Sequence, residues 1–180
     1  PLFLFPVHVV FIEFVIDPAC SIVFEAERSD AGVMERRPRP VQEPLFTPSS
    51  IAIGLLLGLG LLAAVALVYG WAQGSARSEA EGRALAFATL VAGNIALIFA
   101  NRSHTLTIVE MAKHRNVALI WIVGATVAAL AMSIYIAPMA ALFRFDPPAA
   151  ADLAIAVAAG VASVAWYDLY KIARRRQARD

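Results

Sequence analysis

The stretch IAIGLLLGLGLLAAVALVYGW, residues 51–71, decides the fold class of this chain. It has no charged residue, and its length is about what a helix needs to cross the roughly 30 Å hydrocarbon core of a bilayer. The whole chain shows the same bias, because 60% of its 180 residues are hydrophobic and only 16% are charged. Soluble domains average roughly 45–50% apolar and about 25% charged residues. The sequence therefore predicts an integral membrane protein.

Four further stretches have the length and hydrophobicity of membrane spans. Residues 84–100, 117–136 and 150–170 have no charge in their central part, whereas residues 2–24 carry Glu13 and Asp17 near the centre. We predict an all-α fold, a polytopic transmembrane helical bundle of five spans, in which residues 25–50 form a proline-containing loop. The predicted spans are residues 2–24, 51–71, 84–100, 117–136 and 150–170.

The distribution of basic residues predicts the orientation. Of the 15 Lys and Arg residues, all but Arg77, Arg83 and Arg144 lie in the segments 25–50 and 101–116 or after residue 170. The positive-inside rule places these segments in the cytoplasm, so we expect a multi-pass protein of the plasma (inner) membrane with a cytoplasmic C-terminus. The net charge of +1 offers no basic field for nucleic acid. The expected environment is the lipid bilayer, with no nucleic-acid partner.

Glu13 and Asp17 are the candidate functional residues. Their i, i+4 spacing stacks both carboxylates on one helix face, where each charge costs about 2.5–3.5 kcal/mol at mid-membrane depth. Pro18 cannot donate a main-chain hydrogen bond, so carbonyl oxygens become available beside the carboxylates. Several hard oxygens in one place suit a cation, and we predict a site for a transported ion or proton. In the alternative, the acids are protonated or paired with residues elsewhere, and Pro18 is only a kink.

The residues of this span resemble a known family. The run PVHVVFIEFVIDPACSIVFEAE, residues 6–27, and the following VMERRPRP, residues 33–40, are similar to the sixth transmembrane helix and next cytoplasmic loop of P-type cation-transporting ATPases, close to the calcium-pump branch. Those pumps have N-x-x-x-D in the helix and M-x-R-P-P-R in the loop. Glu13 and Asp17 take the two helix positions. The resemblance implies that the five spans are helices six to ten of such a pump.

The resemblance also implies partners and cofactors. The chain would be the C-terminal piece of a longer protein, and its partner would be the N-terminal half of the pump, including its cytoplasmic domains. ATP and magnesium would act only through those upstream domains, so no catalytic or cofactor-binding residue is expected in this chain. The cofactor of the membrane part would be the transported cation itself.

Departures from the family pattern leave the ion open. Glu13 replaces an amide, Ile16 stands where calcium pumps have a hydroxyl, and Pro18 stands where they have Gly. Asn94 aligns with a carboxylate of the eighth helix in calcium pumps with two ion sites, and is either a third ligand or an interhelical hydrogen-bond donor. The ion could be calcium, another divalent ion, a monovalent ion or a proton.

Two other classes of function fit the residues alone. One is a free-standing small carrier or proton channel that uses the same acids without ATP. The other is a non-transporting membrane subunit, in which the acids contact a basic residue of a partner. We also expect His8 to lie at the membrane interface, and the glycines 54, 58 and 60 to pack closely against a neighbouring helix, which in the family is the fifth.

The predicted orientation can be tested by cysteine labelling. In a Cys20→Ala background, single cysteines at Ser78 and Ser29 should react with a membrane-impermeant maleimide from opposite sides, with Ser78 accessible from outside. Labelling of both positions from one side would contradict the five-span arrangement.

Overall fold

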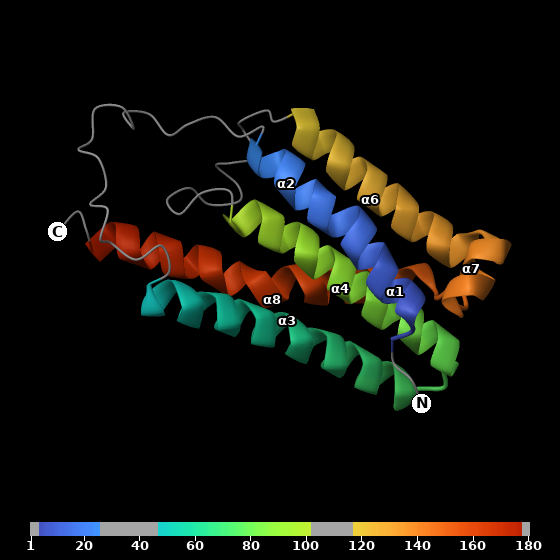
Figure 1. Cartoon of the computed structure of the whole chain (residues 1–180). Coiled ribbons are helices and arrows are strands. Elements are labelled where there is room, and N and C mark those ends of the chain that lie inside the picture. Colours follow the sequence, from blue (N-terminus) through green and yellow to red (C-terminus); the bar gives the residue numbers. More distant parts are fainter. Residues whose placement is uncertain (1–3, 26–46, 102–116, 178–180) are drawn as a thin grey trace.

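The computed structural model describes residues 4–25, 47–101 and 117–177, which are almost entirely helical (Figure 1). Five helices are long and apolar enough to cross a membrane, and no strand occurs in these ranges. This confirms the predicted all-α, five-span fold. Most of the predicted cytoplasmic loops, including the VMERRPRP motif and the 101–116 basic cluster, lie outside the described residues.

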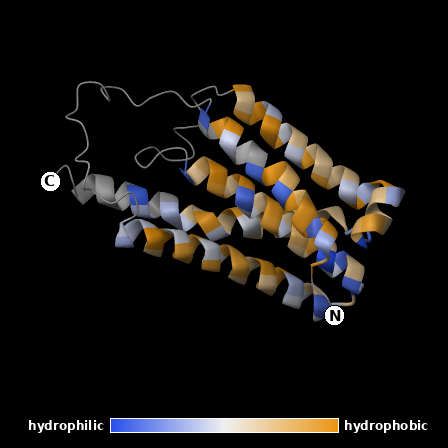
Figure 2. Ribbon diagram, viewed as in Figure 1, coloured by the Kyte–Doolittle hydropathy of each residue, from blue (hydrophilic) through white to orange (hydrophobic). Residues whose placement is uncertain are grey.

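Four of the spans are continuous helices, and hydrophobic residues dominate their middle sections (Figure 2). They are α3 (Pro48–Gln73), α4 (Glu79–Asn101), α6 (Val117–Tyr135) and α8 (Ala150–Gln177). The first span consists of α1 (Pro6–Phe11), a π-helical turn η1 (Ile12–Ile16) and α2 (Asp17–Glu25). A short helix, α7 (Ala137–Phe143), follows α6 and was not predicted from the sequence.

Polar caps extend two helices beyond their apolar stretches. Thr47 caps α3, because its hydroxyl accepts a hydrogen bond from the Ser50 main-chain N–H (3.2 Å), so residues 48–50 belong to the helix rather than to the predicted loop. A capping box precedes α4, in which the Ser78 N–H donates to the Glu81 carboxylate (2.8 Å) and the Glu81 N–H donates to the Ser78 hydroxyl (3.0 Å). Such caps satisfy N–H groups that the first helical turn leaves without partners.

Helix α4 is the centre of the bundle and is buried along most of its length. It packs against α3 and α8, and glycines permit both contacts. A Cβ atom on Gly93 would clash with the Leu61 side chain of α3. A Cβ atom on Gly160 of α8 would clash with the carbonyl oxygen of Thr89 and lie 2.9 Å from the main-chain nitrogen of Gly93. The main chains of α4 and α8 are therefore nearly in contact.

The glycine motif of α3 behaves differently from the prediction. Gly60 faces α8 within this chain, because its Cβ atom would lie 3.3 Å from the Ser163 carbonyl oxygen. The expectation that all three glycines pack against a helix from outside the chain is therefore wrong for Gly60. Gly54 and Gly58 have no described heavy atom within 4 Å of a Cβ position, and their contact with another helix stays a prediction.

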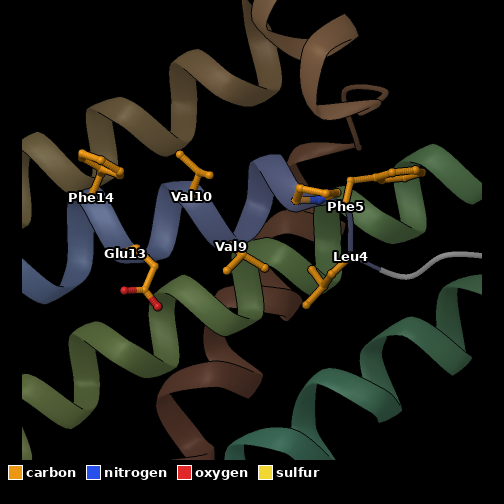
Figure 3. A pocket seen from close by; sticks show the side chains of 7 residues that line it. Leu4, Phe5, Val9, Val10, Glu13 and Phe14 are labelled. Carbon is orange, nitrogen blue, oxygen red and sulfur yellow. The ribbon is translucent and has the colours of Figure 1, made fainter.

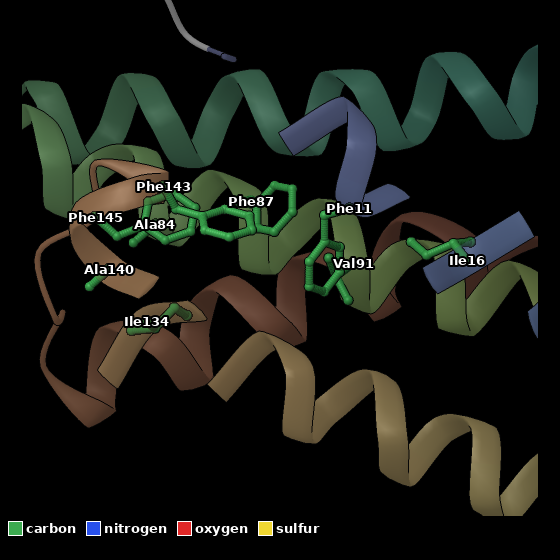
Figure 4. Packing of buried hydrophobic residues seen from close by; sticks show 9 residues of the cluster. All are labelled: Phe11, Ile16, Ala84, Phe87, Val91, Ile134, Ala140, Phe143 and Phe145. Carbon is green, nitrogen blue, oxygen red and sulfur yellow. The ribbon is translucent and has the colours of Figure 1, made fainter. Parts of the chain in front are cut away.

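An aromatic cluster joins the first span to α4 and α7 (Figure 4). Phe11 meets Phe87 edge-on, with ring centroids 5.2 Å apart and planes inclined by 77°. Phe143 and Phe145 extend the cluster at the α7 end. Edge-to-face pairs are favourable beyond the area that they bury, by about 0.5–1.5 kcal/mol each. The first span is thus fixed to α4 by packing on one of its faces.

Charged side chains tie the helix ends together on the α7 side of the bundle. Arg77 donates two hydrogen bonds to the Asp152 carboxylate (2.7 and 2.6 Å), and Arg83 donates to the main-chain oxygen of Arg144 (2.7 Å). Hydrogen bonding to Asp152 raises the pKa of Arg77 above its ordinary value, as expected for a guanidinium paired with a carboxylate. The three arginines outside the basic loops, Arg77, Arg83 and Arg144, therefore lie at the same end of the bundle.

The glycine contact between α4 and α8 predicts that two Gly→Ala substitutions have different effects on the stability of the protein. Gly160→Ala places a methyl group against main-chain atoms that cannot move without separating the helices, and such overpacking costs about 1–3 kcal/mol. Gly124→Ala on α6, where no described atom lies within 4 Å, should be neutral or slightly stabilising because Ala favours helix. Thermal unfolding of the full-length protein in nanodiscs measures both. Equal melting temperatures for the two variants would contradict the proposed contact.

Candidate cation site

The first span is irregular where the two acids lie. In the π-helical turn η1 a main-chain N–H donates to the carbonyl oxygen five residues earlier, rather than four as in an α-helix. The Asp17 N–H, for example, donates to the carbonyl oxygen of Ile12. Pro18 follows directly and has no N–H, so the carbonyl oxygen of Glu13, five residues earlier, receives no hydrogen bond from it. The sequence predicts an interruption at Pro18 itself, whereas the irregular turn lies just before it. Single π-turns are frequent at functional sites.

Glu13 lies within this turn, Asp17 follows it directly, and both side chains point away from the core. Glu13 is the second residue of η1 and Asp17 the first residue of α2, and both side chains are exposed in this chain. Phe11 and Ile16 occupy the opposite, buried side of the span. The Ser21 hydroxyl donates to the main-chain oxygen of Asp17 (3.4 Å), so a hydroxyl oxygen lies beside the main chain at this position.

A groove runs along the span beside Glu13 (Figure 3). Its volume is about 600 Å³, and Glu13 is the one charged residue in its lining. The other lining residues are apolar and include Val9, Val10 and Phe14, of which Phe14 is 78% exposed. An ionised carboxylate surrounded by apolar surface at this depth requires a compensating partner.

Asn94 lies on a different helix from the two acids. It lies in the middle of α4, is half-buried, and donates a hydrogen bond to the Leu90 carbonyl oxygen of its own helix (2.9 Å). Within the described ranges, no group of three or more His, Cys, Asp or Glu side chains is placed to hold a metal ion. The structure thus brings together two of the three predicted ligands along one span, and leaves Asn94 on a separate helix.

His8 is packed inside the protein, and its expected position at the depth of the membrane interface stays a prediction. Its side chain is completely buried among phenylalanine rings, with ring centroids 5.1 Å from Phe87 and 5.0 Å from Phe145. The Phe5 N–H donates to Nδ1 (2.8 Å), so Nδ1 is the acceptor and the proton of the neutral ring is on Nε2. Nε2 has no hydrogen-bond partner among the described residues.

A sequence signal for the position of His8 was available. His8 is about 140° around the helix from Glu13, which places it on the side opposite the acids. From this separation we expected His8 not to be an ion ligand, but we did not predict that its ring is buried. In the structure this ring anchors the start of the first span against α4 and α7. It therefore helps to determine which way Glu13 points.

Comparison with known proteins identifies the family. Residues 1–173 match the family described as "Cation transporting ATPase, C-terminus". A calcium-transporting ATPase of Bacillus subtilis (strain 168) is 26% identical over 148 residues, which are 80% of this chain and 16% of that protein. The chain thus spans about a sixth of the length of this relative. Since the family match extends over nearly the whole chain, this integral, multi-pass membrane protein belongs to the cation-transporting ATPase family as a C-terminal membrane region.

Proposed function

We propose that this chain is the C-terminal membrane part of an ATP-driven cation pump, in which Glu13 and Asp17 bind the transported cation. The observation that carries the proposal is the exposed carboxylate pair at the π-turn of the first span. The core contacts of Phe11 and Ile16 hold the acids on the outward side of the span. Acidic residues inside membrane spans are costly and for that reason are functional by default.

The irregular main chain supports a cation site. Calcium requires six to eight oxygen ligands, and two carboxylates supply only some of them. Carbonyl oxygens around a broken helix supply further ligands in transporters. Because the acids face away from this chain's own core, the remaining ligands would come from the N-terminal half of the pump. This arrangement makes the chain one side of a shared site.

Asn94 remains a candidate for a second position. The side-chain amide nitrogen of Asn94 donates a hydrogen bond to the Leu90 carbonyl oxygen. The side-chain oxygen can still accept a hydrogen bond or bind a cation. Ligation by Asn94 would use this single oxygen, whereas the first span offers two carboxylates. The first-span acids are therefore the primary site in our proposal, and Asn94 is the secondary one.

Calcium is the first ion to test, because the Bacillus subtilis relative is a calcium-transporting ATPase. The amide-to-carboxylate difference at Glu13 leaves other divalent or monovalent cations and protons as alternatives. ATP and magnesium would act in upstream cytoplasmic domains. The distribution of basic residues supports a plasma-membrane location with a cytoplasmic C-terminus. Family membership argues against the free-standing carrier and the non-transporting subunit.

The site assignment predicts different effects for the two acids. In the reconstituted full-length protein, Asp17→Asn should abolish ion-dependent phosphorylation from ATP, because Asp17 adjoins the interrupted main chain. Glu13→Gln should weaken that phosphorylation or change its ion dependence. Glu25→Gln at the end of α2 is the matched control and should behave as wild type. Phosphorylation is measured with labelled ATP across a calcium titration.

Phosphorylation from inorganic phosphate separates a lost ligand from a lost fold. In this family the backward reaction does not require the transported ion, so both acid variants should retain it. Unchanged calcium affinity in Asp17→Asn would overturn the site assignment, even if family membership stands. Loss of both phosphorylation directions in a variant that still folds would also contradict a role limited to ion binding.

A second prediction concerns the chain expressed without the rest of the pump. The first span then exposes two carboxylates to lipid, and each charge opposes insertion by about 2.5–3.5 kcal/mol, roughly a hundredfold in equilibrium constant. Glu13→Leu and Asp17→Leu should each increase membrane insertion of this span, and Glu25→Leu should have little effect. Glycosylation mapping in microsomes measures the inserted fraction. Full insertion of the unmodified span would contradict the need for partner helices.

A further inference from the structure

A second cavity lies between α4, α6 and α8. Its volume is about 320 Å³, and three spans contribute its walls. Tyr135 is the only lining residue that carries a polar side-chain atom, and all others are aliphatic. No part of the proposed ion site contributes to it, so an inference about this crevice is independent of the proposed function.

The crevice is elongated along the axes of the spans. On α6 it runs from Tyr135, the last residue of the helix, down to Val123, which corresponds to about 18 Å at a rise of 1.5 Å per residue. On α8 it runs from Leu153 near the start to Val161, or about 12 Å. Half of a hydrocarbon core of roughly 30 Å is about 15 Å. The crevice is therefore about as long as one leaflet is deep. It begins at the α7 side, and on α4 it reaches Ile95, beyond the middle of that helix.

The size and chemistry of the crevice restrict what it can hold. A helix is about 10 Å across and rises 1.5 Å per residue, so 320 Å³ accommodates only two or three residues of one. Water requires two to four polar partners, which this lining does not offer. The occupant must be apolar, thin and about one leaflet long. A hydrocarbon chain has these properties.

We propose that this crevice binds one acyl chain of a phospholipid from the leaflet on the α7 side. Phospholipid is the source because its chains surround the spans, and its headgroup would lie near the hydroxyl of Tyr135. Tyrosine is typical of this membrane depth, where its ring lies among chains and its hydroxyl among headgroups. The bound lipid differs from bulk lipid because three helices enclose its chain.

The bound chain would complete the packing of α6. This helix has its main contacts with α7, α2 and α4, and faces α8 across the crevice. Helices in lipid associate largely through van der Waals contacts. If the crevice were empty, the side chains that line it would lack such contacts. An acyl chain restores those contacts between α6 and α8. The lipid is therefore expected to stabilise the bundle in proportion to its occupancy.

The test uses two alanines of α6 in the full-length protein. Ala131 lines the crevice, whereas Ala125 is exposed and does not line it. Ala131→Trp should block the crevice with an indole ring, and Ala125→Trp is the matched control. Both variants are reconstituted into phosphatidylethanolamine–phosphatidylglycerol vesicles with a phospholipid that carries a mid-chain photoreactive diazirine. Labelled peptides are identified by mass spectrometry, and retained lipids are counted by native mass spectrometry.

The proposal predicts labelling of α6 and α8 peptides in wild type and Ala125→Trp, and its loss in Ala131→Trp. The Ala131→Trp variant should also retain one phospholipid fewer. Equal labelling and lipid counts in all three proteins would overturn the proposal. Displacement of the label by oleate at low concentration would assign the crevice to free fatty acid instead. Crosslinking of a cysteine at position 131 to an upstream helix would show that protein covers the crevice, and would also overturn it.

Discussion

The close approach of α4 and α8 at Gly160 is the contact on which the rest of the bundle depends. Within a bilayer the hydrophobic effect does not drive helices together, because lipid chains are as apolar as leucine. Contact between main chains, made possible by glycine, supplies van der Waals attraction over many atoms instead. With α4 held by α8 on one side and by Leu61 of α3 on another, it becomes the fixed surface on which the aromatic cluster and the first span pack.

The first span accordingly has two different sides. Phe11, Ile16 and the buried ring of His8 attach it to α4 and α7, while Glu13 and Asp17 remain on the outward side. The π-turn at residues 12–16 changes the rotation of the helix. Pro18, which follows it, has no N–H to donate to the main chain of the preceding turn. Tight packing on one side thus allows costly carboxylates to be presented in a defined position on the other. A shared ion site would need this division.

The spans could be predicted because the bilayer imposes a length and forbids charges, and residues 51–71 meet both conditions without ambiguity. Helix α7 was missed because its seven residues are too few to show a periodic pattern. The π-turn was missed because Pro18 predicts an interrupted helix without defining the form or the exact place of the interruption. The positions of His8 and Gly60 follow from how each helix is rotated, and a sequence defines helical faces without stating which neighbour each face meets. For the same reason, the alignment of Asn94 with a ligand position could not establish its distance from the acids.

The position of Gly160 also affects how the protein is made. Helix α4 leaves the ribosome well before α8, so its tightest partner is the last span of this chain to be synthesised. Until then, α4 has only α3 and the first span to cover it. Premature termination before residue 150 would therefore remove more than one helix, because it would also expose the helix that supports the carboxylates. Messages truncated in this region should yield proteins that membrane proteases degrade, even though every predicted ion ligand has already been translated.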